Sequence, residues 1–133
     1  MRSAPLLLVL ATSCVSQVHA VGGTPGGPAL ECAPGDGLCT KLVDALEVHR
    51  RNIGGWCGTP SIAAYMLLVD AGPDAIPYLA RAFDDRDTEV AELAMRATVE
   101  LGDVGPVVQW CRGVHDLVRI DMCRRALPRT ALL

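Results

Sequence analysis

Cysteines are the residues of this sequence with the clearest chemistry, because the 133-residue chain contains six of them. So high a density is typical of small exported proteins, whose cysteines pair in oxidising compartments. We expect Cys111 to pair with Cys123, since both lie near the turn between two predicted facing helices. We expect Cys32 to pair with Cys39 or with Cys57. Of the five cysteines after residue 20, one is then left free, or bonded between molecules.

The sequence Trp56-Cys57-Gly58 is similar to the start of the active site in thioredoxin-like redox proteins. The second cysteine of that motif is absent here, and the preceding stretch has a helical pattern where the motif requires a strand. We therefore interpret the segment as a turn before a helix, and keep a thiol redox protein using Cys57 as an alternative function. Trp56 and Trp110 are candidate partner contacts, with core packing as the alternative role of each.

Other reactive groups are sparse in the sequence. His49 and His115 are far apart, and we expect both at the surface. The Asp84-Asp85-Arg86-Asp87 segment lacks the spacing of an EF-hand loop, so we expect a turn that ends by capping a helix. Neither metal-ligand spacing nor a phosphate loop occurs in the sequence. We therefore predict no catalytic residues, no cofactor, no metal and no enzymatic activity.

The N-terminal residues have the pattern of a secretory signal. Arg2 precedes a short apolar run at residues 5–11, and Val18-His19-Ala20 fits a signal-peptidase site. We predict cleavage of residues 1–20 and export to the periplasm, the cell envelope or the exterior. The apolar run is too short to cross a bilayer, so we predict no transmembrane span in the mature protein. A lipoprotein signal ending before Cys14 is the alternative, and Cys14 would then carry a lipid anchor.

Charge is distributed unevenly along the chain. Residues 31–103 contain 13 acidic and six basic side chains, a net charge of −7, whereas residues 104–133 contain two acidic and five basic ones, a net charge of +3. An exported protein with a net negative charge binds nucleic acid poorly, so we predict no nucleic-acid partner. The opposite charges favour a further alternative, a self-associating structural envelope protein, with a homodimer as its smallest form.

Helical periodicity dominates the chain after a Gly- and Pro-rich stretch at residues 21–37, which we predict to be a flexible linker. The helix expected over residues 60–71 is apolar all round, which predicts that neighbours cover most of it. Pro77 recurs as Pro106 after an interval of about 30 residues, and such a period indicates stacked helix pairs. Helices are predicted over about 38–52, 60–71, 74–83, 88–101, 105–113 and 116–127, forming units at about 38–72, 73–103 and 104–130.

The segment from Pro73 to Gly102 resembles a HEAT repeat of the short type also found in phycobilin lyases. The resemblance rests on Ile76-Pro77-Tyr78-Leu79 in the first helix, on the Asp-rich turn and on the ending Leu101-Gly102-Asp103. It implies an all-α fold, a short right-handed α-α superhelix of about three antiparallel helix pairs in the 38–133 domain. It also implies binding of other proteins, without implying lyase activity. We accordingly expect an exported, non-catalytic scaffold or adaptor for an unknown protein partner.

Overall fold

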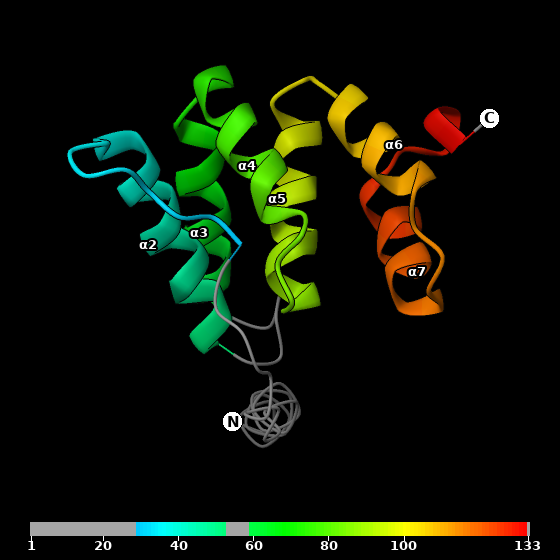
Figure 1. Cartoon of the computed structure of the whole chain (residues 1–133), viewed down its shortest axis with the longest axis horizontal. Helices are drawn as coiled ribbons and strands as arrows, with labels where there is room; N and C mark the ends of the chain where they lie inside the picture. The colour runs from blue at the N-terminus through cyan, green and yellow to red at the C-terminus, as the bar shows by residue number, and fades with distance from the viewer. Residues whose placement is uncertain (1–28, 53–58, 133) are drawn as a thin grey trace, which may run out of the picture.

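The computed structural model describes residues 29–52 and 59–132. Every regular element in these residues is helical, so the prediction of an all-α fold is confirmed. Figure 1 shows the helices following one another along the long axis of the molecule, from α2 at one end to α7 at the other. They are α2 (Gly37–Arg51), α3 (Thr59–Asp70), α4 (Ile76–Ala82), α5 (Thr88–Glu100), α6 (Gly105–Arg112) and α7 (Leu117–Ala126), with 3-10 helices η1 (Pro73–Ala75) and η2 (Arg129–Leu132).

Aspartates and glycines define the ends of several helices. Asp87 accepts a hydrogen bond from the Glu89 N–H at the start of α5, and Asp116, at the equivalent position of the next helix pair, caps α7 in the same way. A side-chain cap of this kind contributes about 1 kcal/mol to helix stability. Gly72 and Gly102, which follow α3 and α5, have φ angles of 81° and 95°, a region that favours glycine. Equivalent residues thus start or end helices at an interval of about 30 residues, which is within the range of helical repeats.

Helix α5 is the centre of the core. It contacts α2, α3 and α4 as well as α6 and α7. The apolar side chains of α5 are small or medium-sized, so they fill the helix interfaces while allowing neighbouring helices to pack closely on several sides. The fully buried apolar side chains of α5 are Val90, Ala91, Leu93, Ala94, Met95 and Ala97.

Helix α3 is less covered than its composition predicted. Ala64 and Leu68 are buried as α3 packs against α2 and α5. Ile62, Met66 and Leu67 are 52%, 57% and 44% exposed. The expectation that neighbours cover most of this helix was therefore wrong, because one side of α3 presents an apolar stripe to solvent.

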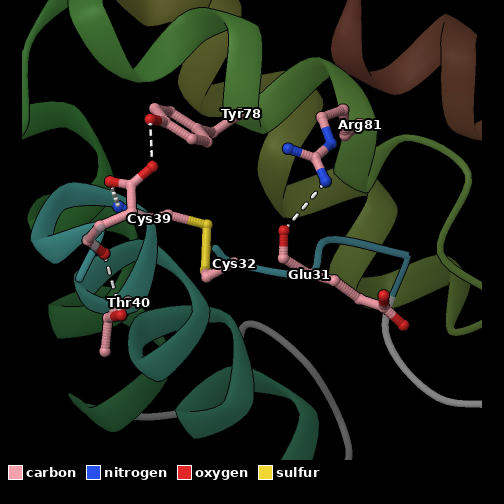
Figure 2. Close-up of a disulfide and its surroundings, with 7 residues drawn as sticks. Glu31, Cys32, Cys39, Thr40, Tyr78 and Arg81 are labelled. Atoms are coloured by element: carbon pink, nitrogen blue, oxygen red, sulfur yellow. Dashed lines mark hydrogen bonds between the residues drawn. A yellow bond between two sulfur atoms is a disulfide. The ribbon is translucent and has the colours of Figure 1, made fainter. Parts of the chain in front are cut away.

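Residues 29–36, here called the strap, pack against the helices. Leu30 is 1% exposed, and a disulfide joins Cys32 to Cys39 in α2. The Arg81 side chain in α4 donates a hydrogen bond to the Glu31 carbonyl at 2.9 Å, as Figure 2 shows. The predicted flexible linker over residues 21–37 was therefore wrong for the strap, because a buried leucine and a disulfide outweigh its Gly- and Pro-rich composition.

Candidate functional site

A groove of about 320 Å³ lies between α3, α5 and α7. We call it the α3–α5–α7 groove. Arg96 and Glu100 lie one helical turn apart, so both side chains project from the same side of α5. Apolar, aromatic and charged groups therefore meet in one groove. The lining residues are Tyr65, Arg96, Val99, Glu100, Arg125 and Ala126.

Glu92 positions the two arginines of this groove. Its carboxylate is buried, accepting a bond from Arg96 Nε at 2.9 Å on Oε2 and one from Arg125 Nη2 at 2.7 Å on Oε1. The hydrogen bonds that Arg125 donates to Glu92 raise the pKa of Arg125, so this guanidinium stays charged. The Arg96 and Arg125 side chains remain 37% and 53% exposed. A shared carboxylate therefore holds two cations at the groove, where they can contact a bound chain.

Tyr65 adds an aromatic group to the same groove from α3. Its side chain is half-buried. Burial raises the pKa of the Tyr65 phenol, and the negative charge of Glu100 adds to this rise. The phenol therefore stays protonated at neutral pH and can donate a hydrogen bond. Met66, the next residue of α3, is 57% exposed, and methionine is an adaptable apolar side chain.

A second groove, of about 620 Å³, lies between the turn after α4 and the turn after α6 and is lined by Trp110 and His115 among others. The Trp110 indole N–H donates to Asp84 Oδ1 at 2.9 Å, and its ring stands edge-on to Phe83, with 6.3 Å between centroids. The Arg119 guanidinium lies 5.8 Å from the Trp110 ring centroid. Trp110 therefore joins α6 to the turn between α4 and α5 while it lines this groove. Trp56 lies outside the described residues.

His49 lies in the interior, so its expected surface position was wrong. It is 1% exposed, and its Nδ1 lies 3.0 Å from Oγ of the equally buried Ser61, which links α2 to α3. Burial lowers the pKa of His49. Because both side chains are buried, the pair joins two helices and does not meet a substrate. The signal was present in the sequence, since His49 continues the apolar spacing of Leu42 and Leu46 along α2.

Asp85 is a buried structural anion, whereas its sequence context predicted only a turn and a helix cap. Its carboxylate accepts bonds from Arg50 Nη1 and Nη2 at 2.8 and 2.7 Å and from the Asp87 N–H at 2.9 Å. The Ala29 N–H also donates to it at 3.4 Å. The hydrogen bonds to Asp85 raise the pKa of Arg50 above its ordinary value. Asp85 therefore joins α2, the strap and the turn before α5.

Two disulfides engage the four cysteines of the described residues. Cys111 in α6 is bonded to Cys123 in α7, with 6.0 Å between Cα atoms, and this is the predicted pair. Cys32 is bonded to Cys39, one of the two partners that the sequence left open. Cys57, on which the redox alternative depends, lies outside the described residues, as does the predicted signal with Cys14.

No three His, Cys, Asp or Glu side chains gather as a metal site within residues 29–52 and 59–132. In the same part of the chain, no helix combines the length and apolar character needed to cross a membrane. Comparison with protein-family models, curated proteins and solved structures finds no match. Function must therefore be inferred from the surfaces of the molecule itself.

Proposed function

We propose that this chain is an exported, HEAT-like repeat protein that acts as a non-catalytic scaffold or adaptor. It binds a partner protein through the side of the molecule formed by α3, α5 and α7. The observation that carries the proposal is the α3–α5–α7 groove, where half-buried Tyr65 and two arginines positioned by Glu92 line one surface, with the exposed Met66 following Tyr65 in α3. Aromatic, methionine and arginine side chains are enriched at protein interfaces and carry much of their binding energy.

A right-handed superhelix of three helix pairs is the arrangement in which such a groove forms naturally. Helix α5 contacts both α3 and α7, which supports stacking of successive second helices. The caps Asp87 and Asp116, and the glycines Gly72 and Gly102, recur at repeat spacing and support equivalent units. Stacked helix pairs present extended surfaces, and repeat proteins use these surfaces to bind other chains.

Export is supported by the two disulfides, Cys32–Cys39 and Cys111–Cys123. Structural disulfides persist in oxidising compartments and are rare in the cytosol. A non-catalytic role is supported by the engagement of the groups most suited to chemistry. The four described cysteines are in disulfides, and the His49–Ser61 pair is shielded from solvent.

Site-specific photocrosslinking tests the proposal in the native environment. A photoreactive amino acid replaces Met66 in one protein and Asp44, an exposed residue of α2 outside the groove, in the matched control. We expect Met66 to give one discrete adduct with another protein, competed away by excess unlabelled chain, and Asp44 to give none. Absence of an adduct at Met66, or equal adducts at both positions, would overturn the proposal.

A further inference from the structure

One side of α3 exposes residues whose equivalents in α5 are buried. Ala63 and Leu67 are exposed, whereas Leu93 and Ala97, their equivalents one helix pair later, are both 0% exposed. Helix α5 contacts α2 and α3, and in the proposed repeat arrangement these two helices cover the side of α5 with Leu93 and Ala97. We call the exposed side of α3 with Ala63 and Leu67 the head face.

At the other end of the molecule, α7 also exposes residues whose equivalents in α5 are buried. Arg124 in α7 is exposed and Ile120 half-buried, whereas Met95 and Ala91, their equivalents one helix pair earlier in α5, are both 0% exposed. Helix α5 contacts α6 and α7, and in the proposed repeat arrangement these two helices cover the side of α5 with Met95 and Ala91. Leu117, on the same side of α7, is 79% exposed. We call this side of α7 the tail face.

The two ends also differ in charge. Residues 29–72 contain five acidic and three basic side chains, a net charge of −2, whereas residues 104–133 contain two acidic and five basic ones, a net charge of +3. We propose that the tail face of one copy packs on the head face of a second copy. This inference rests on the repeat arrangement of the proposed function. Within one molecule α3 packs on α5 and α5 packs on α7, and the proposed contact would repeat this packing between two molecules.

A symmetric pairing of two head faces is less favourable than this head-to-tail contact. It would bring together two ends that each carry a net charge of −2, whereas the head-to-tail contact joins −2 to +3. A head-to-tail contact leaves one face open on each outer copy, so it builds chains of copies and does not stop at a dimer. The attraction between opposite charges is screened by salt, so association should weaken as the salt concentration rises.

Sedimentation velocity of the protein purified with its disulfides formed tests this contact. We expect the mean mass to rise over about a hundredfold range of protein concentration and to fall in high salt. Leu67→Glu on the head face and Arg124→Glu on the tail face should each weaken association at least about tenfold. Gln109→Glu, at an exposed position of α6, should leave it unchanged. Ala63→Glu is a second head-face variant for use if Leu67→Glu does not fold.

Mixing the two interface variants gives the sharpest result. Leu67→Glu keeps an intact tail face and Arg124→Glu an intact head face, so an equimolar mixture should form a dimer and nothing larger. A strict monomer at every concentration and salt would overturn the inference. Undiminished self-association of Arg124→Glu alone would overturn it equally, because that result indicates pairing of two head faces. Since the purified protein contains no partner, either failure leaves the crosslinking test of the proposed function unaffected.

Discussion

Replacing Asp85 with asparagine should be among the most damaging single changes in this small fold. The Asp85 carboxylate is 1% exposed and accepts two short bonds from Arg50 and one from the Asp87 N–H. Removing one partner of a buried ion pair costs about 3–5 kcal/mol, because the remaining charge loses its compensation. Arg50 is 22% exposed and also contacts Glu47 at 2.9 Å, so we expect the lower end, about 3 kcal/mol.

Urea denaturation followed by circular dichroism measures this loss. The matched control is Asp121→Asn, since Asp121 pairs with Arg124 at 3.5 Å between side chains that are 61% and 68% exposed. An exposed pair of this kind contributes about 0–1 kcal/mol. The double variant with Asp85→Asn and Arg50→Met should be only slightly less stable than Asp85→Asn alone, because the ion pair is already broken in the single variant. The reasoning would be refuted if Asp85→Asn lowered the free energy of unfolding by no more than Asp121→Asn does.

The remaining predictions concern single groups. The free energy of unfolding should fall as the pH drops below 6.5, because burial lowers the pKa of His49 in the folded state and the unfolded chain then binds the proton more readily. His49→Gln should reduce this dependence when unfolding is measured against pH, and an unchanged slope would contradict the assignment. Replacing both Cys111 and Cys123 with alanine should cost about 2–3 kcal/mol in urea denaturation, whereas no loss would show that the bridge does not stabilise the α6–α7 pair. Trp110→Phe keeps an aromatic ring but removes the bond to Asp84, and should lower the free energy of unfolding by about 1 kcal/mol; equal stability would show that this bond contributes nothing.

Helix positions followed closely from local signals. The predicted boundaries lie within one or two residues of the observed ones, with η1 and α4 together filling the third predicted helix. Asp87 and Asp116 satisfy unpaired N–H groups at helix starts, and Gly72 and Gly102 adopt positive φ angles after helix ends. Each of these signals acts between residues close in sequence, so the sequence alone was enough to locate it.

Contacts between distant residues were harder to predict. The apolar surface of α3 predicted burial, but periodicity cannot show whether a neighbour is present on every side. Asp85 resembles an ordinary turn aspartate until folding brings it to Arg50, 35 residues away. His49 lay on the apolar spacing of its own helix, but its partner Ser61 is 12 residues away and belongs to another helix, α3. The α3–α5–α7 groove combines residues of three helices, so its composition depends on packing that no single segment encodes.

The affinity of the crosslinked partner for a variant of α3 tests protein binding most directly. Once purified, the partner is titrated against the unmodified chain, against Met66→Glu in α3 and against Asp44→Lys in α2. We predict that Met66→Glu weakens binding at least about tenfold, because it places a charge where an apolar contact is expected, and that Asp44→Lys leaves binding unchanged. Equal affinity of the partner for the unmodified chain and for Met66→Glu would contradict binding through α3, α5 and α7.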